Sequence, residues 1–314
     1  MEKYYFCIDV GGTTIKGGIV DENNNIICQN KVKTEPGEEQ GYLVLSIMEL
    51  IKKLELASGL SVNSSYGVGL GVPGLVNAST GVVRFAGNLK VREYPLKAEL
   101  EKRVSVPVKV ANDADVATLA ELKLGVGQKY KNFIMLTLGT GIGCGIVVDG
   151  KILGISVPYS SEIGHMKVTD TGVTCTCGDK NCFEAVASTR ALSNQTREAM
   201  KQNPDSKMWS KYKLQTVNGK TVFEFLDEDK TAQEVFANYI KNLGNGIVSL
   251  YNIFMPEAVI LGGSISNEKE RLTAPLMEYT NNHVYVKQIN VKTNIVPAEY
   301  TGDAGIVGGK FLFE

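Results

Sequence analysis

A strand, a glycine-rich turn and a second strand occur twice in this chain, and the two copies lie 128 residues apart. At that offset residues 8–11 align with residues 136–139, and Gly17 and Val20 align with Gly145 and Val148. A repeat that begins each predicted half of a chain is typical of a duplicated α/β unit. Glycine and valine are common, so two short hairpins can also match by chance. The repeat favours, without requiring, two related domains.

Hydrophobic periodicity predicts the elements around the two hairpins. We expect strands at residues 4–9, 17–20, 26–32, 66–72, 106–110 and 258–261, and a second hairpin that starts at Phe133. We expect helices at residues 43–56 and 113–124, and a third that follows a capping box at residues 231–234 and runs through Leu250. Strands that alternate with helices favour an α/β fold with a largely parallel core.

The length of 314 residues suggests about two domains. We expect an N-terminal α/β domain over residues 1–115, to which a C-terminal helix at about residues 303–314 returns. A larger α/β domain would span residues 116–302 and include a cysteine-containing loop at residues 165–182. No stretch is polar enough to separate the domains as a linker, so the order of the elements alone sets this boundary.

Composition excludes several classes of protein. Hydrophobic residues make up 43% of the chain and charged residues 21%, which excludes a disordered protein. The net charge of −1 gives no global positive field, so we expect neither nucleic acid nor a membrane surface as a partner. The sequence shows no leader peptide and no run of about 18 apolar residues, so we expect a soluble, cytoplasmic protein.

The first glycine-rich turn carries groups that bind phosphate. Backbone N–H groups, hydroxyls and a cation are what a phosphate requires, and one turn supplies all three through Gly11, Gly12, Thr13, Thr14 and Lys16. The Asp9 carboxylate could hold a hydrated Mg²⁺. The turn is not a Walker A loop, because that pattern is absent from the sequence. A plain hairpin turn is the alternative, but the second copy at Gly139, Thr140 and Gly141 favours two phosphate-binding turns.

Two further strand ends are candidates for ligand contacts. Gly262 and Gly263 follow the strand at residues 258–261 and would let an adenine ring lie against the backbone, although a tight strand-to-helix turn needs the same residues. Asp113 follows Asn112 at the end of the strand at residues 106–110, where a carboxylate could take a proton from a bound hydroxyl. Asn112, Asp113 or Asp115 could equally well cap the helix that follows.

A metal-binding pattern is the strongest single signal in the sequence. His165 is followed by Cys175, Cys177 and Cys182, and three thiolates with one imidazole complete a tetrahedral zinc site. A disulfide is a poor alternative in a protein without an export signal, and inert core thiols do not normally lie in a polar loop. Four protein ligands leave no open position, so the Zn²⁺ would be structural.

Two carboxylates lie beside the ends of the zinc loop. Glu162 precedes His165, and Glu184 follows Cys182. Carboxylates accept hydrogen bonds from the hydroxyls of a polyhydroxylated ligand. Exposed glutamate is common, however, so an ordinary surface position is an equally good interpretation of each.

Taken together, these motifs resemble the ROK family (repressors, open reading frames and sugar kinases), within the actin-like ATPase superfamily. The resemblance covers essentially the whole chain, and the motifs stand in the family's order: residues 9–16 and 139–143 as the phosphate loops, Gly262 and Gly263 as the adenosine loop, and residues 162–165 with the CxCGxxxCxE pattern as the zinc and sugar signature. It implies a two-domain, ribonuclease H-like α/β fold with a ligand cleft between the domains.

The resemblance also implies roles for individual residues. Asp113 would be the general base, and the residues that would contact the sugar hydroxyls are Asn88, Asn112, Asp113, Glu162, His165 and Glu184. His165 would serve zinc and sugar with one ring nitrogen each. The sequence departs from the family pattern at Ser161 and Asn181, where glycine is usual, and at Val91, where glucokinases often carry tryptophan.

The implied reaction is ATP-dependent, Mg²⁺-assisted phosphorylation of a hexose, with glucose and its 6-hydroxyl as the first expectation. Kinases for N-acetylmannosamine, fructose or a β-glucoside are alternatives, because Ser161 and Val91 fall near the expected sugar rim. A sugar-responsive repressor of the same family is a further alternative. It is disfavoured because the first phosphate loop follows only eight residues, with no room for a DNA-binding domain. The resemblance implies a homodimer or homotetramer.

Overall fold

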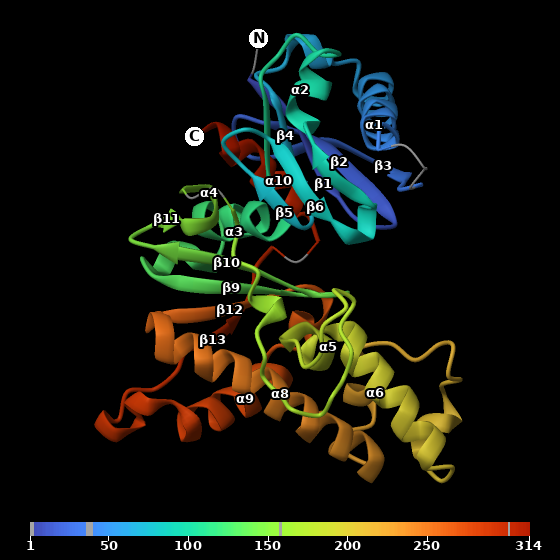
Figure 1. Cartoon of the computed structure of the whole chain (residues 1–314), viewed down its shortest axis with the longest axis vertical. Helices are drawn as coiled ribbons and strands as arrows, with labels where there is room; N and C mark the ends of the chain where they lie inside the picture. The colour runs from blue at the N-terminus through green and yellow to red at the C-terminus, as the bar shows by residue number, and fades with distance from the viewer. Residues whose placement is uncertain (1–2, 36–39, 157–158, 301) are drawn as a thin grey trace. The chain divides into compact units, whose positions relative to one another are not determined.

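The computed structural model describes residues 3–35, 40–156, 159–300 and 302–314 of the chain (Figure 1). The chain folds into two compact units. The first comprises Met1–Lys131, Gly145–Ser161 and Gly302–Glu314, and the second comprises Asn132–Cys144 and Glu162–Thr301. None of the described helices combines the length and the apolar character needed to cross a bilayer.

The sheet of the first unit has the strand order β3-β2-β1-β4-β8. Its strands are β1 (Tyr4–Val10), β2 (Thr14–Asp21), β3 (Ile26–Lys33), β4 (Val68–Val72) and β8 (Val108–Asn112). β1, β2 and β3 pair antiparallel, whereas β1, β4 and β8 pair parallel. The predicted strands are therefore present, but the core is parallel on only one side of β1, because the glycine-rich turn forces a hairpin on the other.

Helices cover both faces of this sheet. Successive residues of a strand point to opposite faces, and a Cβ added at Gly17 would lie 2.9 Å from Leu50 of α1 (Tyr42–Ser58), whereas one at Gly18 would lie 2.9 Å from Ile306 of α10 (Ala304–Lys310). α10 also packs against α3 (Asp113–Lys123) and β1. The C-terminal segment thus completes the unit that the N-terminal segment begins. α1 ends where predicted, at Gly59 with φ 75°.

A small antiparallel sheet, β5-β6-β7, was not predicted from the sequence. Its strands and the helix that follows are β5 (Leu75–Asn77), β6 (Val82–Ala86), β7 (Val91–Tyr94) and α2 (Leu96–Glu101). A 3₁₀ turn at Gly87–Leu89 joins β6 to β7 and carries Asn88. Val91 is 1% exposed and belongs to the apolar core. It therefore lines no open surface, and the expectation that it shapes a sugar rim is wrong.

The second large sheet has the order β11-β10-β9-β12-β13. Its strands are β9 (Phe133–Leu138), β10 (Ile142–Val148), β11 (Lys151–Ile152), β12 (Ala258–Gly262) and β13 (Ile295–Pro297). β12 pairs parallel with β9 and β13, and β10 pairs antiparallel with β11. Position by position this order repeats that of the first sheet. The shared topology supports the duplication that the sequence repeat favoured.

The longest helix of the second unit is α8 (Lys230–Phe254). It packs against α5 (Phe183–Ala187), α6 (Thr189–Gln202), α7 (Thr221–Glu224) and α9 (Glu270–His283). The short helix α4 (Leu153–Ser156) belongs to the first unit. The predicted capping box at residues 231–234 is wrong. Asp229 is the N-cap, and its Oδ1 accepts the Ala232 N–H at 2.8 Å, because the helix begins two residues earlier than predicted.

Candidate functional site

The first predicted phosphate loop is the tight turn between β1 and β2. The Gly11 N–H donates to the Thr14 carbonyl at 3.0 Å and closes the turn. Thr34 fixes it from outside: its hydroxyl donates to the Gly11 carbonyl at 2.7 Å, and its N–H donates to the Thr13 carbonyl at 3.0 Å. A Cβ at Gly11 would lie 2.7 Å from the Thr14 carbonyl oxygen, so only glycine fits there.

Asp9 and Lys16 form a cross-strand pair at the base of this turn. Burial raises the pKa of the Asp9 carboxyl, and the Lys16 ammonium opposes that rise. Gly305, in the first turn of α10, packs so closely that a Cβ there would lie 2.7 Å from the Asp9 carboxyl carbon. The carboxylate is therefore held between the turn and α10.

Asn88 lies against the same turn. A Cβ at Gly12 would come within 3.2 Å of Asn88 Nδ2. Gly12 was predicted in a phosphate loop from the residues of the turn, whereas Asn88 was predicted in a sugar site from the family resemblance alone. The structure brings the two residues into contact within the first unit.

Asn112 and Asp113 stand at the junction of β8 and α3. Asn112 is the N-cap of α3: its Oδ1 accepts the N–H groups of Ala114 and Asp115 at 2.8 and 3.3 Å, and its Nδ2 donates to the Gly74 carbonyl at 3.0 Å. Asp113 is the first helical residue and is half-buried, with its Oδ1 accepting the Ala114 N–H at 2.9 Å. Of the three candidates for the cap, Asn112 supplies it.

Asp115 is part of the packed interior instead. Its side chain is 1% exposed, and its Oδ2 accepts a hydrogen bond from the Ser160 hydroxyl at 2.5 Å. A Cβ at Gly154 would touch it at 2.2 Å. A substitution at Asp115 would therefore test folding rather than proton transfer.

The second predicted phosphate loop is the turn between β9 and β10, and hydrogen bonds hold it as well. The Gly139 N–H donates to the Gly141 carbonyl at 3.0 Å. The start of α6 fixes the turn, because the Arg190 N–H donates to the Gly139 carbonyl at 3.2 Å and the Thr189 hydroxyl donates to the Leu138 carbonyl at 3.1 Å.

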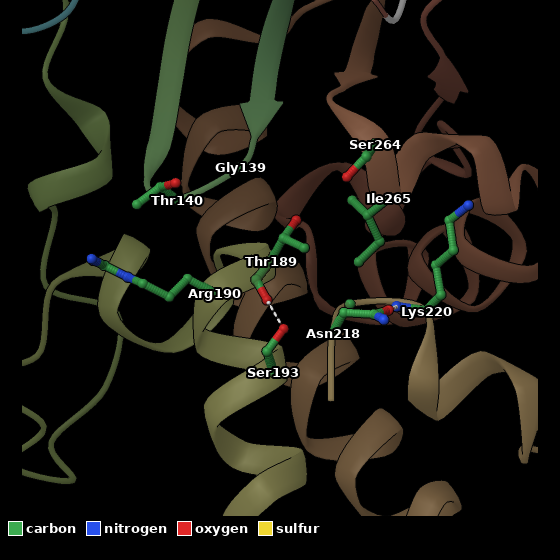
Figure 2. A pocket seen from close by; sticks show the side chains of 10 residues that line it. Gly139, Thr140, Thr189, Arg190, Ser193, Asn218, Lys220, Ser264 and Ile265 are labelled. Carbon is green, nitrogen blue, oxygen red and sulfur yellow. Dashed lines mark hydrogen bonds between the residues drawn. The ribbon is translucent and has the colours of Figure 1, made fainter. Parts of the chain in front are cut away.

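A pocket of about 660 Å³ opens beside this second turn, within the second unit (Figure 2). It is lined by Gly139, Thr140, Thr189, Arg190, Ser193, Asn218, Gly219, Lys220, Ser264 and Ile265. Arg190 and Lys220 lie on opposite sides of it (Figure 2). The volume falls within the range typical of sites for small molecules.

The glycines of the predicted adenosine loop, Gly262 and Gly263, do not line this pocket, but the residues that follow them do. Gly263 has φ 88°, and a Cβ there would lie 2.2 Å from the Leu138 carbonyl oxygen, so the backbone of this loop packs directly on the end of β9. The next two residues, Ser264 and Ile265, line the pocket. The two glycines thus bring their neighbours to the pocket and do not line it themselves.

Of the ten residues that line the pocket, only Gly139 and Thr140 were predicted as site residues from the sequence. Thr189, Arg190 and Ser193 lie on the first turns of α6, and Asn218 and Lys220 lie in the turn before α7. The sequence contains a recognisable signal only for the three residues on α6. Ser188 accepts the Ala191 N–H at 3.1 Å as the N-cap of α6, and a serine before a helical pattern is a recognisable start signal.

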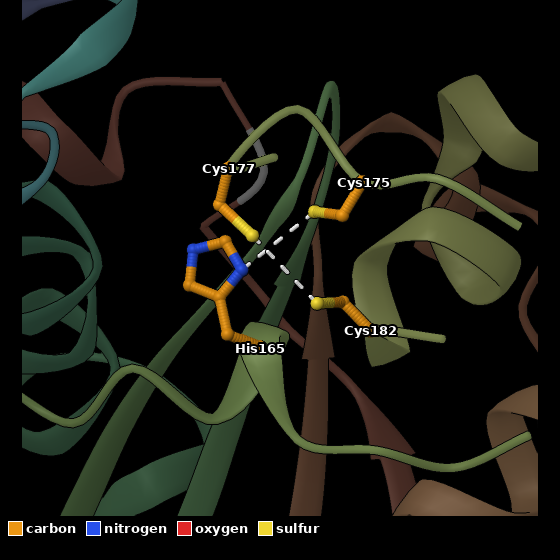
Figure 3. Close-up of side chains that lie close together, drawn as sticks. All are labelled: His165, Cys175, Cys177 and Cys182. Atoms are coloured by element: carbon orange, nitrogen blue, oxygen red, sulfur yellow. Dashed lines mark hydrogen bonds between the residues drawn. The ribbon is translucent and has the colours of Figure 1, made fainter. Parts of the chain in front are cut away.

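The four predicted zinc ligands converge in the second unit (Figure 3). The ligand atoms of His165, Cys175, Cys177 and Cys182 all lie within 4.8 Å of one another. Cys175 Sγ lies 3.7 Å from His165 Nδ1, and the Sγ atoms of Cys177 and Cys182 lie 3.8 Å apart. Two sulfur ligands on a tetrahedral zinc ion, at about 2.3 Å each, lie roughly 3.8 Å from one another. The side chains therefore fit a tetrahedral zinc ion.

Local turns in the loop present these ligands. The Cys175 N–H donates to the Asp179 carbonyl at 2.7 Å, and the Gly178 N–H donates back to the Cys175 carbonyl at 3.0 Å. Asn181, which replaces the family's glycine, has φ 64°, a conformation that asparagine tolerates better than most residues. This departure from the family pattern therefore leaves the loop intact.

The cysteines of this cluster differ in acidity. Burial raises the pKa of the Cys175 thiol to about 12, whereas the backbone N–H of Asp179 lowers the pKa of the exposed Cys177 thiol. A bound zinc ion deprotonates coordinating thiols outright, so it would override the burial of Cys175.

Glu184 connects the cysteine loop to the second predicted phosphate loop. It is 9% exposed, and its Oε1 accepts from Cys175 Sγ at 3.1 Å and from the Thr176 hydroxyl at 3.0 Å. Its Oε2 would meet a Cβ on Gly141 at 2.3 Å. Glu162 is more exposed, and its Oε2 lies 4.0 Å from His165 Nε2. The histidine thus turns Nδ1 to the cysteines and Nε2 to a carboxylate.

Comparison with known proteins defines the class. The family model described as "ROK family" matches residues 5–314. The "Glucokinase" of Halalkalibacterium halodurans is 32% identical over 99% of this chain and 95% of its own. A crystal structure of a ROK family glucokinase from Streptomyces griseus, in complex with glucose and AMPPNP, covers 98% of both chains with 30% identity and a TM-score of 0.86. The xylose repressor of Bacillus subtilis is 27% identical over 97% of this chain and 75% of its own.

The fold and the matched sequence define a two-domain α/β protein of the actin-like ATPase type. Within that class, the chain belongs to the ROK family.

Proposed function

We propose that the chain is an ATP-dependent hexose kinase that transfers the γ-phosphoryl group of ATP to the 6-hydroxyl of glucose. The observation that carries this proposal is the match to the glucose- and AMPPNP-bound glucokinase over 98% of both chains. Homology at about 30% identity supports the sugar kinase more firmly than the individual sugar, because a few side chains at a rim decide between hexoses.

Asp113 would act as the general base. The Asn112 cap leaves this carboxylate outside the capping role, at the C-terminal end of a parallel strand, where ligands bind in sheets of this type. A positioned carboxylate there can accept the proton of the attacking hydroxyl. Asn88, Asn112, Glu162, His165 and Glu184 would bind the remaining sugar hydroxyls.

ATP would contact the two glycine-rich turns and the pocket at Gly139. Gly11, Gly12, Thr13, Thr14 and Lys16 would contribute backbone N–H groups, hydroxyls and a cation from the first turn, and Gly139, Thr140 and Gly141 would act from the second. Asp9 fits a hydrated magnesium ion, because its carboxylate is held at the base of the first glycine-rich turn. Such an ion neutralises the charge that spreads over the transferring phosphoryl group.

Zinc would be structural. The donor set of one imidazole and three thiolates fills all four positions of a tetrahedral ion, so His165, Cys175, Cys177 and Cys182 leave no site for water or substrate. The ion would hold the loop whose Cys175 and Thr176 orient Glu184.

A coupled assay of ADP release tests the reaction and the sugar together. Glucose should give the highest kcat/KM in a panel with N-acetylmannosamine, fructose, mannose and a β-glucoside. A tenfold preference for another sugar would replace glucose in the proposal and leave the sugar kinase standing. Absence of sugar-dependent ADP release with every member of the panel would refute the kinase.

A further inference from the structure

Helix α6 contributes to the nucleotide pocket at its start and continues beyond it. Thr189 and Ser193 line the pocket, and Arg197 lies one helical turn further along. Residues four apart share one face of a helix, so Arg197 extends the face that begins at the pocket. Arg197 is not itself among the lining residues.

The guanidinium of Arg197 holds a separate segment of chain. Its Nε donates to the Leu214 carbonyl at 2.9 Å, and its Nη2 donates to the Val217 carbonyl at 2.7 Å. Its Nη1 donates to Asn194 Oδ1 at 2.8 Å, which fixes the guanidinium to its own helix. One planar group thus joins α6 to two carbonyls of residues 214–217.

The held segment runs directly into the other wall of the pocket. Asn218 and Lys220 follow Val217 and line the pocket on the side away from Arg190 (Figure 2). The described residues 211–220 contain neither a helix nor a strand that would fix their backbone by a hydrogen-bond ladder. Within the wall, Asn218 Oδ1 accepts the Lys220 N–H at 2.9 Å, and Asn218 Nδ2 donates to the Thr216 carbonyl at 3.3 Å, so hydrogen bonds join this turn to the residues before it.

We propose that Arg197 is a positioning residue for ATP: it sets the width of the nucleotide pocket by holding the wall at Asn218 and Lys220 to α6, without touching the nucleotide. This inference rests on the proposed kinase function. Lysine cannot replace arginine in this role, because a single ammonium lacks the planar fork that reaches two carbonyls and an amide in fixed directions.

The test compares Arg197→Lys and Arg197→Ala with wild type and with a matched control. Arg103 is the control, because its Nη1 also donates to a backbone carbonyl, that of Glu99 at 2.6 Å, but in the first unit and outside the pocket lining. Both Arg197 variants should raise the KM for ATP about tenfold, the factor that about 1.4 kcal/mol produces. The KM for the sugar should stay within about twofold, and Arg103→Lys should change neither value.

Three results would overturn the inference. The first is a folded Arg197→Lys protein whose KM for ATP stays near the wild-type value. The second is a parallel rise of both KM values with a fall in melting temperature, which would mark a general structural role. The third is failure of Arg197→Lys as well as Arg197→Ala to fold, which would show that the bonds serve folding.

The same variants separate this inference from the proposed function. Wild-type protein without sugar-dependent ADP release would refute the kinase, not the role of Arg197. Calorimetric titration of wild type and Arg197→Lys with ATP would then decide the inference, with about tenfold weaker binding to the variant expected. Equal affinities would overturn it.

Discussion

Two glycines of the turn between β9 and β10 should separate ATP binding from sugar binding. A Cβ added at Gly139 meets no atom within 4 Å, and Gly139 lines the pocket. A Cβ added at Gly141 would lie 2.3 Å from Glu184 Oε2. Gly139→Val therefore places new atoms where the nucleotide is proposed to bind, whereas Gly141→Ala pushes on a proposed sugar ligand.

The expected size of the Gly139→Val effect follows from what the side chain displaces. Its stability should change by no more than about 0.5 kcal/mol, since no neighbour is displaced and the residue has no left-handed φ. Loss of one hydrogen bond between a backbone N–H and a charged phosphate costs about 1.5–3 kcal/mol. The KM for ATP should therefore rise roughly 10- to 100-fold, because each 1.4 kcal/mol is about a factor of ten.

Gly141→Ala should show the opposite pattern. The carboxylate of a glutamate can usually move away from a new methyl group. In Glu184, however, hydrogen bonds from Cys175 and Thr176 to Oε1 oppose this movement. We expect a larger rise in the KM for glucose than in that for ATP. Steady-state kinetics with each substrate varied in turn, together with melting temperatures, measure both effects. A folded Gly139→Val protein with a normal KM for ATP would refute the assignment of the second phosphate turn.

The remaining predictions concern the base, the metal and the fold. Asp113→Asn keeps hydrogen bonding but removes the proton acceptor, so kcat should fall by about 10²–10⁴ with little change in the KM for sugar; near-normal kcat would exclude Asp113 as the base. Elemental analysis should find about one zinc per chain, and its removal by a chelator, or Cys177→Ala, should lower activity and melting temperature together; active protein without zinc would exclude the structural role. Asp229→Ala should cost about 1–2 kcal/mol of unfolding free energy in denaturant titrations, since it removes the cap of α8. Although burial raises the pKa of Asp229, hydrogen bonds from Ala232, Ser206 and Lys207 hold it below the usual value. The contribution of Asp229 to the free energy of unfolding should therefore be present above the ordinary carboxyl pKa and be lost as the pH falls through the lowered folded-state pKa. An Asp229→Ala protein with wild-type stability at neutral pH would contradict the role of Asp229 as a stabilising cap.

The sequence predicted those parts of the fold that depend on local patterns. The β1–β2 hairpin, α1 with its Gly59 stop, and the strand before Gly262 all combine regular apolar spacing with a glycine at the end. The cluster of three cysteines and one histidine was predictable for a different reason, since these residues within a polar loop have few uses other than metal binding.

What the sequence did not predict depends on contacts between distant residues. The strands of the β5-β6-β7 sheet span three to five residues and include exposed charges such as Arg84 and Glu93, so they show no clear periodicity. Asn218 and Lys220 line the pocket at the end of a segment that Arg197, from a different element, holds through two backbone carbonyls. Val91 is buried rather than at a rim because β7 turns it into the core. No local pattern encodes these placements.

Glu184 gives a physical reason why the proposed structural zinc would lie close to the proposed catalytic site. Its carboxylate receives hydrogen bonds from a zinc-loop cysteine and threonine on one oxygen, and its other oxygen abuts the backbone at Gly141. A displacement of the loop must therefore move the carboxylate, and the carboxylate cannot move toward the turn without meeting Gly141. Zinc would thus fix the distance between a sugar ligand and a phosphate-binding turn, a distance on which positioning for phosphoryl transfer depends.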